Sequence, residues 1–178
     1  FLKRLWKLVA KHLASETATV LEVESLDDAQ KAVRRKTHET IAKVDDDFGR
    51  RQHFNTAIAA IMELCNELAK LDMQNAQSRA IMAEALHAII PMLSPIVPHI
   101  CQELWRALGC TGDLLNTPWP LVDEAALTRD SIEMAVQVNG KVRGRIQVAV
   151  DADRDTVAAA AMAQDNVVRF VEELTVRT

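Results

Sequence analysis

The chain has 178 residues, of which 49% are hydrophobic and 26% charged, with five glycines and five prolines. This is the composition of an ordinary folded protein, and it excludes a disordered chain. The length excludes a mini-protein that needs disulfides or metals to fold. The formal net charge of −4 argues against a general nucleic-acid coat and against a DNA partner, so any polyanion site is expected to be a local patch.

The three cysteines, Cys65, Cys101 and Cys110, are odd in number and show no C-x-x-C spacing. Reduced thiols in a cytoplasmic protein are therefore expected rather than a disulfide framework. His99 and Cys101 match no zinc-ligand spacing, so no metal site is predicted. No apolar run reaches the roughly 18 residues of a membrane span, and no signal peptide opens the chain, so no membrane partner is expected.

Residues 1–13 place apolar side chains at helical spacing with Lys and Arg between them, which predicts an amphipathic helix. The chain begins with Phe rather than Met, and its last residues have the pattern of a strand that stops early. We therefore expect a piece of a longer polypeptide.

A long helix is predicted over residues 26–48, because apolar residues recur there at steps of three and four. At about 100° per residue, its first half carries a basic face on the side away from the apolar stripe. This predicted outer face consists of Lys31, Arg34, Arg35 and His38. For the aspartates at 45–47, a solvated helix face is favoured over a cation site, whose ligands would converge from a loop. Gly49 then marks a break.

Three further helices are predicted before residue 110. The first begins near Phe54, which belongs to its apolar stripe, with Asn55 as the candidate N-cap. The second spans residues 75–92. The third follows Pro95 or Pro98, either of which suits the first helical position. Helices of this length joined by short loops favour an antiparallel bundle.

Over residues 132–148 the apolar residues alternate, which predicts two antiparallel strands. A two-residue Asn-Gly turn would pair Val136 with Arg143 and mix the apolar and polar faces. A three-residue loop over 138–140, with Gly140 left-handed, keeps the faces apart and is therefore predicted. This register places three cations in one row on the polar face: Lys141, Arg143 and Arg145.

Residues 153–163 are predicted to form an Ala-rich helix capped by Asp153, and Asp165 begins a second short helix. Two strands alone are marginally stable, so a third strand is expected to complete this part. The predicted fold class is mainly α. An antiparallel helical bundle occupies residues 1–128, and a small, truncated α+β domain with a β-hairpin and two short helices occupies residues 129–178.

No enzyme motif is present: the chain has no P-loop, no dinucleotide-binding glycines, no zinc-protease pattern and no nucleophile elbow. No catalytic or cofactor-binding residue is therefore predicted. The basic groups remain as candidates. The hairpin cations suit a polyanion, because Gly140 and Gly144 beside them let another backbone approach closely.

Other interpretations of the same features stay open. The hairpin cations also suit an edge guard against aggregation, and the basic helix face suits simple solubility. The whole chain also fits a protein-interaction bundle whose α+β tail docks a peptide along its open strand edge. Trp105, on an amphipathic helix, is predicted to lie in the core rather than to stack on a base.

Residues 34–68, which begin RRKTHETIAKVDDDFGRRQHFNTAI, and residues 91–127, which begin PMLSPIVPHICQELWRALG, resemble the anticodon-binding helical domain of class Ia aminoacyl-tRNA synthetases. The stretch VQVNGKVRGRIQV is similar to the opening hairpin of the C-terminal domain of bacterial leucyl-tRNA synthetases, and residues 151–177 match the continuation of that domain. The equivalent domain of another class Ia synthetase is the alternative, against which the hairpin argues.

The resemblance implies a tRNA-binding and positioning fragment of an enzyme that ligates leucine to its tRNA. The family's catalytic domain, which uses ATP and Mg, its editing domain and its last C-terminal strands have no counterpart in these residues. The fragment is therefore expected to hold no cofactor, and whether it has any activity of its own is left open. The implied partners are leucine tRNA and the two missing domains, in the cytoplasm.

In this family the leucine enzyme does not read the anticodon. Its bundle rests on the body of the tRNA, and its C-terminal domain reaches the outer corner and the long variable arm. Folded RNA hides its base edges, so recognition of shape and phosphates by cations suits this use. The resulting candidate tRNA-binding residues are Lys141, Arg143, Arg145, Gly140, Gly144, Arg34, Arg35, His38, Arg50 and Arg51.

Overall fold

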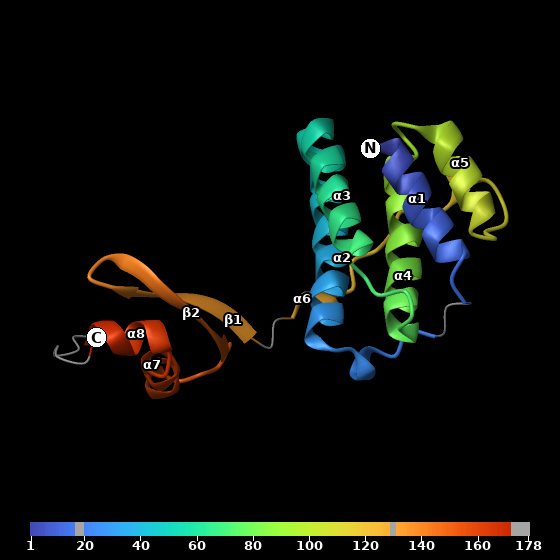
Figure 1. Ribbon diagram of the computed structural model, residues 1–178. Helices are drawn as coiled ribbons and strands as arrows, with labels where there is room; N and C mark the ends of the chain where they lie inside the picture. The colour runs from blue at the N-terminus through green and yellow to red at the C-terminus, as the bar shows by residue number, and fades with distance from the viewer. Residues whose placement is uncertain (17–19, 129–130, 172–178) are drawn as a thin grey trace. The chain divides into compact units, whose positions relative to one another are not determined.

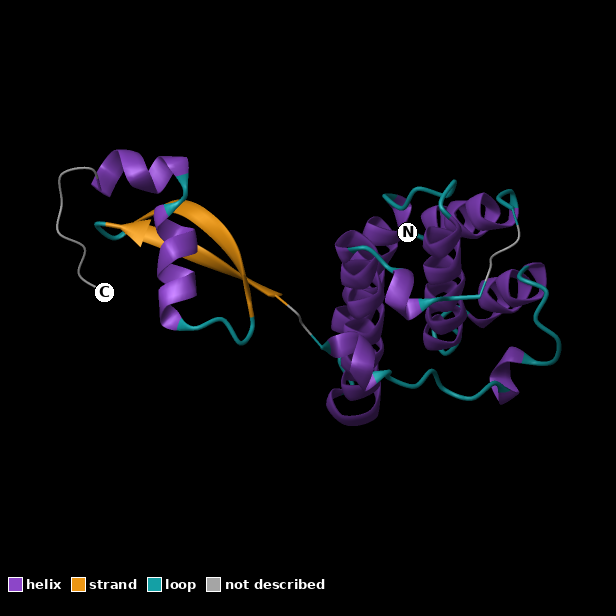
Figure 2. Cartoon of the chain, turned by 90° about the horizontal axis from the view of Figure 1, so that it is seen from below, coloured by secondary structure: helices purple, strands orange, loops and turns teal. Residues whose placement is uncertain are grey.

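The computed structural model describes residues 1–16, 20–128 and 131–171. The chain divides into two units, Phe1–Leu127 and Thr128–Thr178, each of which is described by itself. The first is a bundle of helices and the second a hairpin with two helices (Figures 1 and 2). The predicted fold class is confirmed.

In its described residues the bundle contains six α-helices, with three shorter helical turns between them. They are α1 (Leu2–Leu13), α2 (Asp28–Asp46), α3 (Phe54–Ala69), α4 (Ala76–Leu93), α5 (Pro98–Ala107) and α6 (Glu124–Leu127), with the turns η1 (Val23–Ser25), η2 (Asp47–Arg51) and η3 (Leu114–Asn116). Helix α2 packs against α3, α4 and α6, while α1 lies against α3 and α4 (Figure 1). The long helix α2 runs directly into η2, which is a π-helical turn.

Local sequence explains where these helices start. The side chain of Asp27 accepts a hydrogen bond from the backbone of Gln30, whose own side chain returns one to Asp27, so α2 begins with a capping box. Asn75 caps α4 in a similar way, and Pro98 occupies the first position of α5. The predicted N-cap at Asn55 is wrong, because α3 already begins one residue earlier.

The core of the bundle gathers around α4, which is buried on nearly every side. Apolar stripes of the other helices face it, as their spacing predicts. Its largest fully buried side chains include Leu5, Ile61, Leu64, Leu68, Leu86, Ile89 and Leu104. Trp105 is buried as predicted, whereas Phe54, also predicted in a stripe, is 50% exposed. All three cysteines are free thiols. No helix in the described ranges is long and apolar enough to cross a membrane.

The second unit contains one antiparallel hairpin of β1 (Ser131–Val138) and β2 (Lys141–Ala149). Asn139 and Gly140 form a two-residue turn with φ of 53° and 75°, the signs that a type I′ turn requires. Met134 lies opposite Ile146, and Ile132 opposite Val148. The predicted three-residue loop and its register are therefore wrong.

A β-bulge in β2 allows the two-residue turn without mixing the apolar and polar faces. Gln137 pairs with Val142 but Val136 pairs with Gly144, so Arg143 is an extra residue in β2. Beyond the bulge the apolar residues return to one face, where Ile146 and Val148 are buried. The tight turn and the separated faces thus coexist through one inserted residue.

Two helices, α7 (Arg154–Met162) and α8 (Asp165–Val171), pack against the hairpin (Figure 2). The Asp153 side chain accepts a hydrogen bond of 2.8 Å from the backbone N–H of Thr156, which confirms the predicted cap of α7. Val167 of α8 is buried. The start of a further strand, expected over 175–178, lies outside the described residues.

Candidate nucleic-acid interface

The three hairpin cations do not form the single row that the predicted register gave. Lys141 pairs with Val138, and Arg145 pairs with Ala135. These two partners are three residues apart on β1, so their side chains lie on opposite faces of the hairpin. Arg143 occupies the bulge between them and is half-buried, whereas Lys141 and Arg145 are exposed. The hairpin therefore presents Lys141 and Arg145 on opposite faces, and the three cations do not share one face.

The two glycines of the hairpin differ in what surrounds them. Gly140 has open space around the position of a Cβ and a φ of 75°, which L-residues with side chains rarely adopt. A Cβ on Gly144 would lie 3.5 Å from Cγ2 of Val167 and 3.7 Å from Gln164. Gly144 thus faces the helical layer of its own unit, and the expected close approach of a ligand backbone there is not supported.

Arg34 and His38, predicted on an outer basic face of α2, are buried with exposed fractions of 7% and 5%. Nη2 of Arg34 lies 3.1 Å from Oε1 of Glu84 on α4 and 2.6 Å from Oδ2 of Asp123, which directly precedes α6. Nε2 of His38 lies 3.3 Å from Oε1 of Glu84, and Nδ1 of His38 accepts a 3.1 Å hydrogen bond from the backbone N–H of Asp123. These donors and acceptors are engaged inside the bundle, so the predicted outer face is wrong for both residues.

The charges of this buried cluster stabilise one another. Burial alone would raise the pKa of Glu84, but hydrogen bonds from His38 and Arg34 outweigh it, and the pKa is lowered. Burial likewise opposes the charge of Arg34, yet hydrogen bonds to Glu84 and Asp123 raise its pKa. The hydrogen bond from Arg34 also lowers the pKa of Asp123. The cluster joins α2, α4 and the segment that leads into α6.

We expect the bundle to lose stability in acid because of these carboxylates. Their pKa values in the folded chain lie below their ordinary values, 4.5 for Glu84 and 3.8 for Asp123. The stabilisation is therefore complete above those ordinary values and is lost as the pH falls through the lower folded values. Urea unfolding followed by circular dichroism should give a level free energy above about pH 5 and a decline below about pH 4. Stability that stays level down to about pH 3 would contradict the assignment.

Two further predicted cations of the bundle, Arg50 and Arg51, are exposed on the turn η2. Nε of Arg50 lies 2.6 Å from Oδ1 of Asp46, and Nε of Arg51 lies 2.7 Å from Oδ2 of the same carboxylate. Each guanidinium is thus held through Nε, which leaves its terminal nitrogens for another partner. Arg35, the other predicted residue on α2, is half-buried.

The last residue of the aspartate run, Asp47, is structural and does not belong to a solvated face. Asp47 is 1% exposed, and its Oδ2 accepts hydrogen bonds of 2.8 Å from Nζ of Lys43 and 2.7 Å from Oγ1 of Thr56. The bonds from Lys43 and Thr56, in that order, lower the pKa of Asp47. The turn between α2 and α3 is therefore closed around a buried carboxylate.

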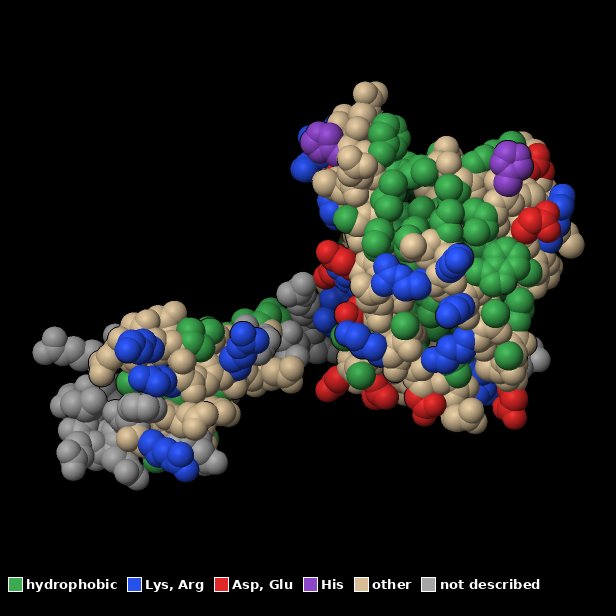
Figure 3. All heavy atoms as spheres, turned by 45° about the horizontal axis from the view of Figure 1, so that its top comes forward, with side chains coloured by type: hydrophobic (Ala, Val, Ile, Leu, Met, Phe, Trp, Pro, Cys, Tyr) green, Lys and Arg blue, Asp and Glu red, His purple; other side chains and the backbone are tan. Residues whose placement is uncertain are grey.

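Two exposed aromatic side chains were missed as candidates by the sequence analysis. Phe54, at the start of α3, is 50% exposed, and Trp6, on α1, is 49% exposed. Trp6 lies about one helical turn from Lys3 and directly precedes Lys7, both of which are also exposed, and α1 contains no acidic residue. The cations around Trp6 and the absence of acidic residues from this helix were visible in the sequence, and they are the signal that would have found this surface. Figure 3 shows Lys and Arg side chains gathered on one face of the bundle.

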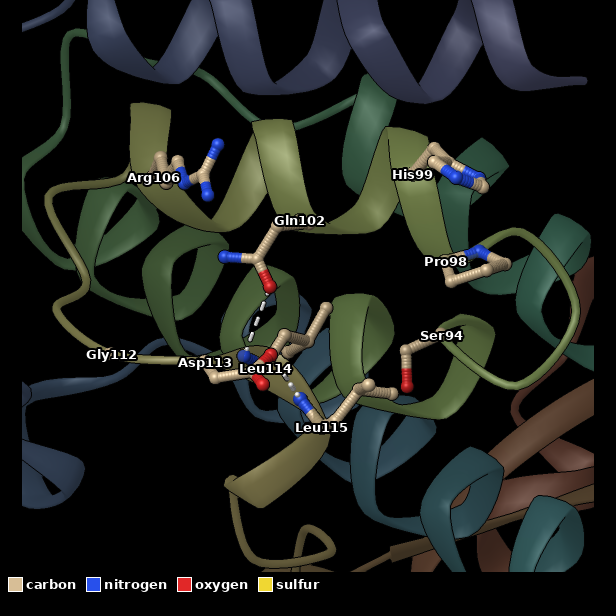
Figure 4. Close-up of a pocket in the computed structure, with 9 residues that line it drawn as sticks. All are labelled: Ser94, Pro98, His99, Gln102, Arg106, Gly112, Asp113, Leu114 and Leu115. Carbon is tan, nitrogen blue, oxygen red and sulfur yellow. Dashed lines mark hydrogen bonds between the residues drawn. The ribbon is translucent and has the colours of Figure 1, made fainter.

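A cavity of about 550 Å³ lies between α5 and the segment around η3 (Figure 4). Its polar groups are largely engaged inside the chain: Oε1 of Gln102 accepts a 3.0 Å hydrogen bond from the backbone of Leu114, and Arg106 pairs with Glu103. The side chain of Asp113 caps η3 by accepting from the backbone of Leu115. This hollow shows no arrangement of groups suited to catalysis.

The surface of the chain thus offers cations and exposed aromatic rings on a bundle, followed by a hairpin with further cations. A family model described as "Anticodon-binding domain of tRNA ligase" matches residues 30–159. The chain belongs to this family of anticodon-binding domains. The match begins inside α2 and extends through the hairpin into α7.

Similar proteins extend this result over the whole chain. The chain is 56% identical over 178 residues to a leucine–tRNA ligase of Cellvibrio japonicus (strain Ueda107), which covers 99% of the chain and 21% of that relative. It is also 56% identical to a leucine–tRNA ligase of Stenotrophomonas maltophilia (strain R551-3), across 99% of the chain and 20% of the relative. This anticodon-binding domain chain therefore spans about a fifth of the length of these curated relatives.

A solved structure is similar in fold as well. The fold matches a crystal structure of a ternary complex of the Agrobacterium radiobacter K84 LeuRS with tRNA and LeuAMS at a TM-score of 0.75 and 27% sequence identity. The match covers 99% of this chain and 23% of that one. The resemblance to bacterial leucyl-tRNA synthetases is thus confirmed by sequence and by fold.

Proposed function

We propose that this chain is the tRNA-binding and positioning part of a cytoplasmic leucine–tRNA ligase. In this proposal it holds leucine tRNA while the catalytic and editing domains of the same polypeptide attach and check leucine, with ATP and Mg used in the catalytic domain. The observation that carries the proposal is the family match over residues 30–159, together with relatives named leucine–tRNA ligase that align across 99% of the chain.

The surface groups support binding to folded RNA rather than to a base sequence. Exposed cations lie on several separate elements, among them Lys3 and Lys7 on α1, Arg50 and Arg51 on η2, and the hairpin group around Lys141. Scattered cations of this kind neutralise phosphates and fix the position of an RNA. No sequence-reading groove is required, because the grooves of folded RNA hide base edges.

Binding of the 178-residue chain to leucine tRNA, and to a tRNA without a long variable arm, tests this proposal. If about three to five phosphates are neutralised, log K should fall against log salt with a slope of about −2 to −4. The leucine tRNA is expected to bind more tightly at each salt concentration. Filter binding or fluorescence anisotropy across a salt series measures both quantities.

The variant Lys141→Ala locates the effect on the hairpin. Removing one phosphate contact should reduce the salt slope by about one, while an exposed substitution changes stability by under about 0.5 kcal/mol. Tight binding with a slope near zero would contradict the electrostatic proposal and favour a peptide-docking module. Absence of binding to both tRNAs would overturn a tRNA-binding role for this chain by itself.

A further inference from the structure

Phe54 is an aromatic side chain at a position where its helical spacing predicts burial, yet it is half exposed. It is the first residue of α3 and lies at the end of the bundle, beside the turn η2. Its ring is supported from within: the centroid of Phe48 lies 5.2 Å away, and Phe48 in turn lies 6.0 Å from Trp119. Three rings thus form a tilted series whose outermost member faces solvent.

The turn that carries Phe54 is held in one conformation by several independent contacts. The buried Asp47 binds Lys43 and Thr56 through its side chain, and its backbone carbonyl accepts a 2.9 Å hydrogen bond from His53. Gln52 has a φ of 55°, the left-handed conformation that reverses the chain before α3. Phe54 is therefore presented by a rigid scaffold, which lowers the entropy lost when a ligand binds.

Cations lie in sequence directly before this ring. Arg50 and Arg51 are 71% and 50% exposed at their side chains, and both are oriented by Asp46 through Nε. His53 is exposed as well. An exposed ring that follows oriented guanidinium groups on the same turn matches the two chemical parts of a nucleotide, since the ring stacks on a base and the cations bind its phosphate.

We propose that Phe54 is a stacking platform for an unpaired RNA base, with Arg50 and Arg51 binding the phosphate beside that base. This inference rests on the proposed function, because the RNA in question is the tRNA. The contact tolerates any base, since every base has a π-face and none of the three side chains here is required to read a base edge. The platform therefore positions the RNA and does not select its sequence.

A protein partner packing on Phe54 is the competing occupant of this surface. Such an interface would bury the ring together with two charged guanidinium groups that share one carboxylate. Interface cores are depleted of charged groups, and desolvating charge without full pairing is unfavourable. A nucleotide avoids this problem because its phosphate supplies the missing negative charge.

The first test compares Phe54→Ala, Phe54→Leu and Arg50→Ala in tRNA binding by the 178-residue chain. Loss of one stacked base should weaken binding by roughly 5- to 150-fold in Phe54→Ala and leave the salt slope unchanged. Arg50→Ala should instead reduce the slope by about one. Phe54→Leu keeps an apolar contact with Phe48 without a flat ring, so it should bind almost as weakly as Phe54→Ala while its melting temperature stays close to that of the unmodified chain.

A second readout does not depend on tRNA. The chain is titrated with single-stranded pentaadenylate and with an abasic ribose-phosphate chain of the same length, and the ring resonances of Phe54, assigned from Phe54→Leu, are followed by NMR. Shifts with pentaadenylate alone are the expected result. Equal tRNA affinity in Phe54→Ala, without ring shifts, would overturn the platform and leave the proposed function standing. Ring shifts from a chain that binds no tRNA would overturn the proposed function and support base stacking.

Discussion

Replacing Glu84 by Ala is expected to lower the free energy of unfolding of the bundle by about 1–3 kcal/mol, the range for leaving a buried donor without its acceptor. Glu84 accepts hydrogen bonds from Nε and Nη2 of Arg34 and lies within 3.3 Å of Nε2 of His38. The Arg34 side chain is only 8% exposed, so its charge would stay buried with Asp123 as its remaining carboxylate partner. Chemical denaturation followed by circular dichroism measures the difference.

Glu63→Ala is the matched control on the neighbouring helix. Glu63 pairs with Lys36 at 3.0 Å, but the two side chains are 67% and 32% exposed. Solvated pairs of this kind contribute only about 0–1 kcal/mol, so the control should change the free energy of unfolding little. Equal effects of the two substitutions would show that the cluster around Arg34 has no special role.

The helices of the bundle were predictable because their signals are local. Apolar residues at steps of three and four gave every long helix, and the caps at Asn75 and Asp153 act within three residues of themselves. The buried side of α2 was not predictable in the same way. Its apolar stripe is narrower than the arc that packs against α3, α4 and α6, so Arg34 and His38 fall inside the buried arc.

Phe54 shows the opposite error. Its spacing places it in the apolar stripe of α3, but it is the first residue of the helix. There the ring of Phe48 covers only one side of its own ring. Periodicity identifies the side of a helix that is buried and gives no information about where its neighbours end. The candidate site on the bundle therefore had to be moved from the α2 face to the α2–α3 turn.

The hairpin register could not be predicted because two preferences of the sequence conflict. Asn139-Gly140 favours a two-residue turn, whereas alternation favours separated faces, and without a bulge one excludes the other. The bulge at Arg143 satisfies both preferences, and no local sequence pattern predicts that bulge. The single row predicted for Lys141, Arg143 and Arg145 followed from the wrong register, and their contact with RNA stays a prediction.

Asp47→Ala is expected to lower the melting temperature of the chain by several degrees and to weaken tRNA binding at the same time. The substitution removes the acceptor of both Lys43 and Thr56 and leaves a small void where a buried carboxylate closed the turn. Arg50, Arg51 and Phe54 all follow within seven residues of Asp47 and depend on the turn for their positions. A thermal melt and the tRNA titration, run on the same protein, measure the two effects.

Asp45→Ala separates this structural effect from a loss of charge. Asp45 is exposed and lies two residues before Asp47, so its substitution removes the same formal charge without removing a buried contact. The melting temperature should therefore not change, and tRNA binding should be equal or slightly tighter. If Asp47→Ala also tightened binding, long-range repulsion by the aspartate run would govern the turn's contact with RNA. Weaker binding in Asp47→Ala alone requires that the geometry of the turn, rather than its net charge, determines how the nucleotide is held.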